Sequence, residues 1–249
     1  MLHWEIMAKL VCVYCGSDKD QSKDHIPPKC LFSEPRPSDL ITVPCCVKCN
    51  RRYSKNDTYF RDMLVLRQDM ASQPKIGPLI ETVLRSMGRS EAEGYFRFLY
   101  SQMGSHDART AAGVYVGAQP TVRVDIGRIC DVVNRMVQGL YYYENNRILS
   151  RDYDVETYTQ EYIDRLEYQE LEVFVSTFVP PIISAPEKSI ADGVFKYKMA
   201  KSNDPDCTLW SLVFFDRIFF ISLTFPKNRM LPSKRSISWT DNPGSYHVN

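Results

Sequence analysis

The sequence predicts an α+β protein in which a small metal-held module precedes a region that mixes helices with an antiparallel sheet. Six of the eight cysteines lie between residues 12 and 49, where long periodic runs are scarce. Apolar residues recur at helical spacing from about residue 57 to about residue 110, and β-branched and aromatic runs dominate after about residue 172. We therefore expect two domains, residues 1–60 and residues 61–249.

The composition is that of an ordinary globular protein and excludes several other classes of protein. Of the 249 residues, 44% are hydrophobic and 24% charged, which excludes a disordered or low-complexity chain. No run approaches the 18 or so apolar residues of a membrane span, and the first residues lack the features of a signal peptide. We expect a cytoplasmic protein. The net charge of +1 says little about partners, because a nucleic-acid-binding protein needs only a local basic face.

The expected elements of the second domain follow from periodicity. Helices are expected from about residue 57 and at 75–87, 90–103, 126–144 and 156–168. A hairpin is expected at 112–124 with its turn near Gly117–Pro120. Strands are expected at 173–183, 194–200, 208–215 and 218–225, and the last two form an antiparallel hairpin about Asp216–Arg217. The polar tail after Pro226 is expected to be loose.

Four of the N-terminal cysteines form two C-x-x-C pairs, Cys12 with Cys15 and Cys46 with Cys49. Each pair places two thiolates at the spacing of half a tetrahedral zinc site, so the two pairs together predict structural Zn²⁺. Cys45 also has a permissible spacing to Cys49. We favour Cys46 because its spacing repeats that of the first pair.

The segments KDHIPPKCLF and VPCCVKCNRRYSKND lie between and around these pairs. Together with the cysteines they resemble the HNH endonuclease superfamily, specifically its cysteine-containing branch, over about residues 10–62. The resemblance implies a ββα-metal, treble-clef-like fold, in which a zinc ribbon clamps a β-hairpin and one helix.

The resemblance also implies roles for three residues. His25 would be the general base that activates water, and Asp24 and Asn50 would hold a catalytic Mg²⁺ or Mn²⁺. An imidazole titrates near working pH, and carboxylate and amide oxygens suit a hard cation. The alternative for the adjacent Asp24 and His25 is a structural hydrogen-bonded pair.

One position departs from the family pattern, and the role of another stays open. Asp39 stands near the place of the middle asparagine, which normally orients the loop that aims the base. Asp57 is a candidate for a further metal ligand or for the cap of the following helix, and we favour the cap. The basic residues Lys48, Arg51, Arg52 and Lys55 would lie against phosphates, or form only a solvated helix face.

The expected function is a metal-dependent endonuclease acting on DNA, double-stranded in the first instance. One alternative is a non-catalytic zinc-binding module that docks on nucleic acid or a protein, and another is a ribonuclease, because nothing in the metal site selects the sugar. The region after residue 60 carries no motif with an assigned role. A homodimer or a protein partner bound through that region is a further expectation.

Overall fold

The computed structural model describes residues 11–70 and 72–228, which fall into two compact units. One unit combines residues 11–60 with 128–228, and the other contains residues 61–70 and 72–127. In this partition residues 128–228 belong with the cysteine-rich segment, whereas we expected them to belong with residues 61–127. The overall class is α+β with antiparallel sheets, as predicted.

The cysteine-rich segment forms a hairpin followed directly by a helix. Strand β1 (Gln21–Ile26) pairs with β2 (Ile41–Cys46), a 3₁₀ turn η1 (Lys29–Leu31) lies in the connection, and α1 (Val47–Val65) begins at the residue after β2. The helix therefore starts ten residues before the expected position at about residue 57. The expected cap at Asp57 is wrong, since Asp57 lies inside α1.

A five-stranded antiparallel sheet forms the other half of this unit, in the order β5-β9-β8-β7-β6. Its strands are β5 (Tyr153–Thr159), β6 (Glu187–Ile190), β7 (Phe195–Lys201), β8 (Thr208–Phe214) and β9 (Ile218–Pro226). The pairing of β8 with β9 confirms the hairpin expected about Asp216–Arg217.

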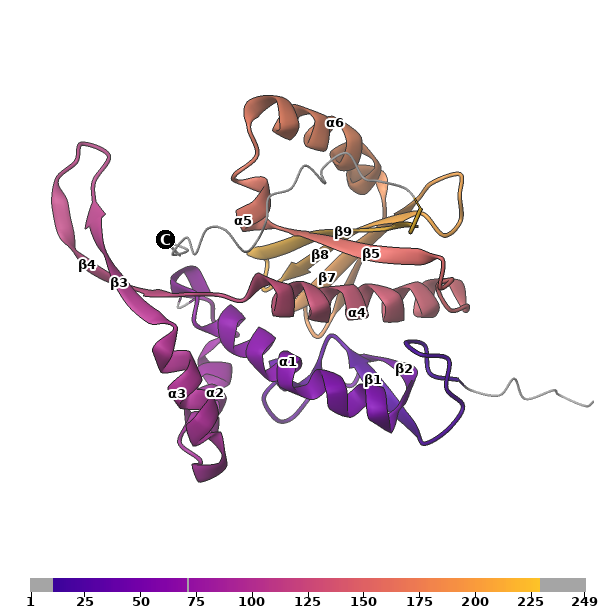
Figure 1. The fold of residues 1–249 in the computed structure, drawn as a ribbon, viewed down its shortest axis with the longest axis horizontal. Helices are drawn as coiled ribbons and strands as arrows, with labels where there is room; N and C mark the ends of the chain where they lie inside the picture. Colours follow the sequence, from indigo (N-terminus) through magenta and orange to yellow (C-terminus); the bar gives the residue numbers. More distant parts are fainter. Residues whose placement is uncertain (1–10, 71, 229–249) are drawn as a thin grey trace, which may run out of the picture. The chain divides into compact units, whose positions relative to one another are not determined.

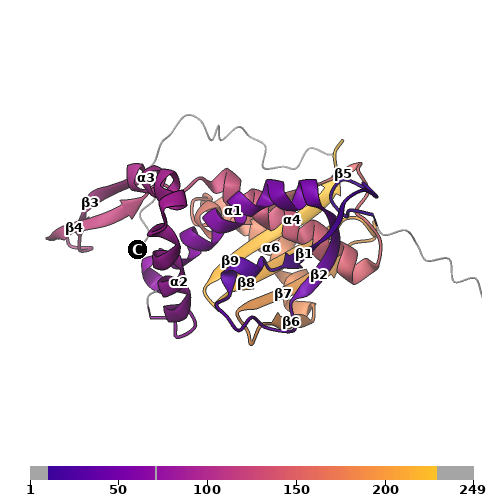
Figure 2. The same cartoon turned by 90° about the horizontal axis from the view of Figure 1, so that it is seen from below.

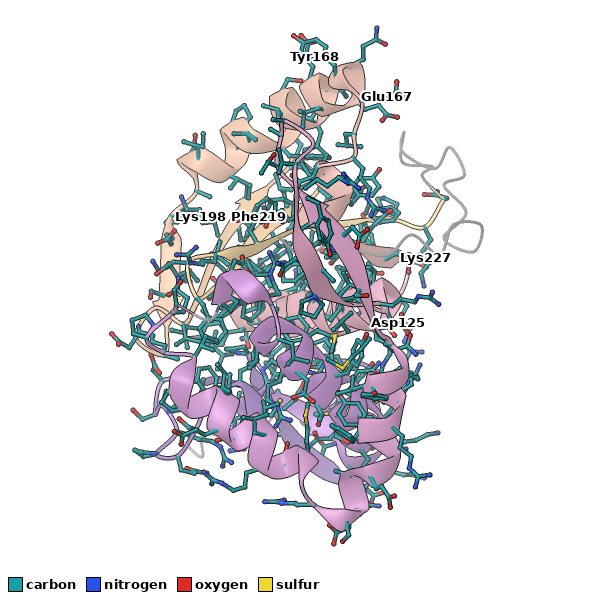
Figure 3. All side chains as sticks on the ribbon, turned by 90° about the vertical axis from the view of Figure 1, so that its left-hand side faces the viewer. Asp125, Glu167, Tyr168, Lys198, Phe219 and Lys227 are labelled. Atoms are coloured by element: carbon teal, nitrogen blue, oxygen red, sulfur yellow. The ribbon has the colours of Figure 1, made fainter. Side chains whose placement is uncertain are left out.

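Helices cover both faces of this sheet (Figure 1). One face packs toward α4 (Ile126–Asn145) and α1, whereas α6 (Tyr168–Ser184) crosses the other. Seen from below, α1 and α4 run across the sheet side by side (Figure 2). The α4 face of the sheet is the core, where Trp210, Phe214 and Phe220 are buried and Phe60 of α1 contacts the last two. On the α6 face, Lys198 and Phe219 are half-buried, and Tyr168 of α6 projects outward (Figure 3).

Two sequence predictions in this unit are wrong. The helix expected at 156–168 is instead strand β5 followed by the short helix α5 (Gln160–Ile163). The strand expected at 173–183 lies within α6, whose N-terminus carries a capping box formed by Glu167 and Glu170. The β-branched residues of α6 reduce helix propensity only slightly, so packing of its aromatic face against Tyr158 decides the outcome.

The second unit contains the end of α1, two further helices and a separate hairpin. Its elements are η2 (Gln68–Met70), α2 (Gly77–Met87), η3 (Ser90–Ala92), α3 (Glu93–Ser101), β3 (Met103–Arg109) and β4 (Tyr115–Val122). The hairpin turn lies between residues 109 and 115, not at Gly117–Pro120 as expected. Gly113, at φ +83°, supplies the left-handed conformation that this turn requires. The expected loose tail lies outside the described residues, apart from its first two positions.

Candidate metal centre and adjoining acidic site

Four cysteines meet where the hairpin joins the helix. Cys12 and Cys15 lie in the turn before β1, Cys46 ends β2, and Cys49 lies in the first turn of α1. Their sulfur atoms all lie within 4.8 Å of one another, and Cys15 Sγ is 3.6 Å from Cys46 Sγ. Zinc–sulfur bonds of about 2.3 Å in a tetrahedron place the sulfurs roughly 3.8 Å apart. The cluster therefore fits a metal ion and could bind zinc.

Cys45, the competing candidate, lies outside this group of four. Its side chain is fully buried and its thiol donates to the backbone carbonyl of Cys46. Burial raises the pKa of Cys45, which favours a neutral thiol. Burial also acts to raise the pKa of Cys12, but backbone hydrogen bonds from Cys46, Cys15 and Tyr14 outweigh it and lower that pKa to about 7. Cys12 is thus disposed to be the thiolate that a metal requires.

The three residues of the expected nuclease site lie on β1 and α1. Asp24 pairs with Val43 and His25 with Thr42 in the β1–β2 register. Because side chains alternate along a strand, Asp24 is buried on one face and His25 is half-exposed on the other. Asn50 lies in the first turn of α1, where its Nδ2 donates to Ser22 Oγ at 2.9 Å and to the Lys23 carbonyl at 3.3 Å. These bonds fix Asn50 against the two residues of β1 that precede Asp24.

The carboxylate of Asp24 is held by other groups of the chain. The hydroxyl of Tyr14 donates to its Oδ2 at 2.6 Å, and the backbone N–H of His25 donates to its Oδ1 at 3.0 Å. Arg135 of α4 lies 3.3 Å from Oδ2 through its Nη1. The other terminal nitrogen of Arg135 pairs with Asp57, so the guanidinium links two carboxylates.

The electrostatics of this acidic site follow from its burial. Arg135 is 2% exposed, and its Nε has no hydrogen-bond partner among the described residues. Burial raises the pKa of Asp57 to about 6, although Arg135 opposes the shift. The pKa of Arg135 rises: burial opposes its charge, but Asp24 and Asp57 outweigh burial. Two acids thus share one buried guanidinium.

His25 has a different environment. Burial, with the nearby charge of Lys29, lowers its pKa from 6.5 although Asp24 acts in the opposite direction. The imidazole is consequently neutral at pH 7, the form that accepts a proton. His25 therefore meets the protonation requirement of a general base.

The remaining expected residues divide into two groups. The Oδ2 of Asp39 accepts the backbone N–H of Ala191 at 2.9 Å, and among the described residues no hydrogen bond joins Asp39 to the loop after His25. This contact does not support the predicted role of Asp39 in orienting the loop. Four of the five basic residues of α1 are exposed at the spacing of one helix face. They are Lys48, Arg51, Arg52 and Lys55.

Two residues of the acidic site, Tyr14 and Arg135, were not found from the sequence. The available signal was an arginine within the apolar stripe of α4, whose neighbours Val132 and Met136 are fully buried. An arginine at such a position requires a buried acid, because an unpaired charge there is costly.

Comparisons with known proteins return no match among family models, curated proteins or solved structures. Among the described residues, no helix is both long enough and apolar enough to cross a membrane.

Proposed function

We propose that the chain is a metal-dependent endonuclease that hydrolyses phosphodiester bonds of DNA, with Zn²⁺ in the four-cysteine cluster. The observation that carries the proposal is the order of hairpin, cysteine cluster and helix. The cluster joins the turn before β1 to the start of α1. That junction keeps Asp24 and His25 on the strand next to Asn50 at the start of the helix.

The chain's own residues supply most of the required chemistry. Neutral His25 takes a proton from water, the water oxygen attacks phosphorus, and the P–O3′ bond breaks with the leaving oxygen taking a proton from solvent. Asp24 and Asn50 would provide oxygen ligands for Mg²⁺ or Mn²⁺, which would neutralise charge on the phosphate when bound. Asn50 would offer its Oδ1, because its Nδ2 is engaged by β1.

The basic face of α1 supports a polyanionic substrate. The four exposed cations described above lie on the helix that begins at the cysteine cluster. Contacts to phosphate position a nucleic acid without reading its sequence. Double-stranded DNA is accordingly the first substrate to test, and the site chemistry does not by itself separate DNA from RNA.

A second candidate function has its own support: a non-catalytic zinc-binding module that docks on nucleic acid or on a protein. The observation that favours it is the burial of Asp24, only 6% exposed, under Tyr14 and Arg135. The metal ion of a working nuclease must contact both its ligands and the substrate. In this arrangement the guanidinium of Arg135 lies against the Asp24 carboxylate, where such an ion would bind.

The experiment uses zinc-loaded protein with plasmid DNA, single-stranded DNA and RNA in parallel, with and without Mg²⁺ or Mn²⁺. The proposal expects nicking of DNA that requires the added ion and is lost in His25→Ala, whereas the control His106→Ala cleaves normally. Cleavage by His25→Ala would refute the assigned base. Salt-sensitive binding without cleavage under any condition selects the docking module, and cleavage confined to RNA selects a ribonuclease.

A further inference from the structure

The guanidinium of Arg135 occupies the space in front of the Asp24 carboxylate. Its Nη1 is 3.5 Å from Oδ1 and 3.3 Å from Oδ2, so it faces both oxygens almost equally. Among the residues that the structure describes, the two other groups that bond this carboxylate are the Tyr14 hydroxyl and the His25 backbone N–H. A hard divalent ion sits about 2.0–2.6 Å from carboxylate oxygens. It would therefore need the region that Arg135 now fills.

Arg135 is held in this place from three sides. Its Nη2 pairs with Asp57 of α1, and its guanidinium carbon lies 4.8 Å from the centre of the Tyr53 ring, a cation–π distance. Its Nη1 contacts with Asp24 are longer than a good charge-assisted hydrogen bond, which is typically about 2.7–2.9 Å. Nη2 therefore pairs with Asp57, while Nη1 is spread over the two oxygens of Asp24.

We propose that Arg135 determines the cation affinity of the candidate nuclease site. The inference rests on the proposed role of Asp24 as a ligand of Mg²⁺ or Mn²⁺. While the guanidinium lies on Asp24, the carboxylate takes no divalent ion. A divalent ion binds when the guanidinium withdraws from Asp24 and keeps Asp57 as its partner. Arg135 is accordingly a residue that sets the affinity of the site, and it is not itself a metal ligand.

Charge explains the direction and the size of the expected effect. A monovalent cation within about 5 Å of a divalent one weakens binding about tenfold even at the dielectric constant of water, and more in a buried site. Replacing Arg135 with the uncharged Met, which keeps much of the side-chain volume, removes this repulsion. We therefore expect Arg135→Met to bind Mn²⁺ at least about tenfold more tightly than the unmodified protein.

The measurement is a titration of the zinc-loaded full chain with Mn²⁺, in which electron paramagnetic resonance counts the free ion. Mn²⁺ is a poor competitor for thiolate ligands, so the cysteine cluster does not interfere. Arg135→Lys keeps the charge and should stay within a few-fold of the unmodified protein. The matched control is Arg128→Met, an arginine of the same helix that bonds Asn56. It should leave Mn²⁺ affinity unchanged.

Two further variants keep the test decisive. Arg135→Met/Asp24→Asn should lose the gained affinity, which locates the ion at Asp24. Arg135→Met/Asp57→Asn removes one of the two carboxylates left without a guanidinium, and it replaces the single variant if that one fails to fold. Unchanged or weaker Mn²⁺ binding in the folded variants would overturn the inference. Because the readout is binding, an absence of DNA cleavage in all proteins refutes the nuclease proposal and leaves this result standing.

Discussion

Gly139 of α4 allows the helix to approach the cysteine-rich hairpin, and its substitution by alanine tests that contact. A Cβ atom at this position would lie 2.2 Å from Ile26 Cδ1 and 3.2 Å from the Tyr14 hydroxyl oxygen. Ile26 is 1% exposed, so its terminal methyl has little free space to enter. The methyl group of Gly139→Ala must therefore displace Ile26 of the hairpin and Tyr14, whose hydroxyl bonds Asp24.

The magnitude follows from two opposing effects. Overpacking a filled core costs about 1–3 kcal/mol, whereas replacing glycine by alanine inside a helix contributes about 0.5–1 kcal/mol of stability. We expect Gly139→Ala to lower the free energy of unfolding by about 1 kcal/mol. The same substitution at Gly94 of α3, where a new methyl group would meet no atom within 4 Å, should raise stability instead.

A double-mutant cycle identifies the atom responsible. Ile26→Val removes Cδ1, the atom nearest the new methyl, and by itself costs about 0.5–1.5 kcal/mol. In Gly139→Ala/Ile26→Val the clash is relieved, so we expect a stabilising coupling energy of about 1 kcal/mol. Urea unfolding followed by tryptophan fluorescence measures it, since Trp210 is fully buried in the same unit. Additivity of the two single changes within about 0.5 kcal/mol would refute the packing argument.

Three further predictions concern the candidate sites. Cys46→Ser should lose bound zinc and unfold the hairpin, whereas Cys45→Ser should keep one zinc per chain by atomic absorption. Asp39→Ala removes the acceptor of the Ala191 N–H and should cost about 1 kcal/mol in urea unfolding without changing the cleavage rate. Cleavage should be half-maximal at a pH below 6.5, because burial lowers the pKa of His25 and protonation of its imidazole removes the base; a half-maximal pH above 6.5 would contradict this assignment.

The cysteine cluster could be predicted from sequence because its information is local. Two C-x-x-C pairs fix the spacing within each pair, and the structure brings together the four cysteines that this spacing singles out. The hairpin of β8 and β9 was also predictable, since two apolar runs flank a two-residue turn at Asp216–Arg217. Helix α4 matched its expected range to within one residue, because its apolar residues keep helical spacing over five turns.

Of the misassigned elements, β5 depends on a distant partner, whereas α6 carries local helix signals. Strand β5 lies at the sheet edge and pairs with β9, about 65 residues later in the chain. Helix α6 is rich in valine, yet Phe174 and Phe178 lie four residues apart and both contact Tyr158. That i,i+4 aromatic pair and the Glu167 capping box were the local signals that outweigh β-branched content.

The acidic site shows why a motif alone does not establish an active nuclease. Asp24 and His25 could be named from their pattern, but the group that faces Asp24 is Arg135, 111 residues later. A buried arginine requires an acid as its partner, and Arg135 has two, Asp24 and Asp57. The pairing of Arg135 with Asp24 therefore follows from the fold and not from the motif. Whether Asp24 binds a divalent ion therefore depends on the guanidinium of Arg135 that faces it. The Mn²⁺ titration of Arg135→Met measures that dependence directly.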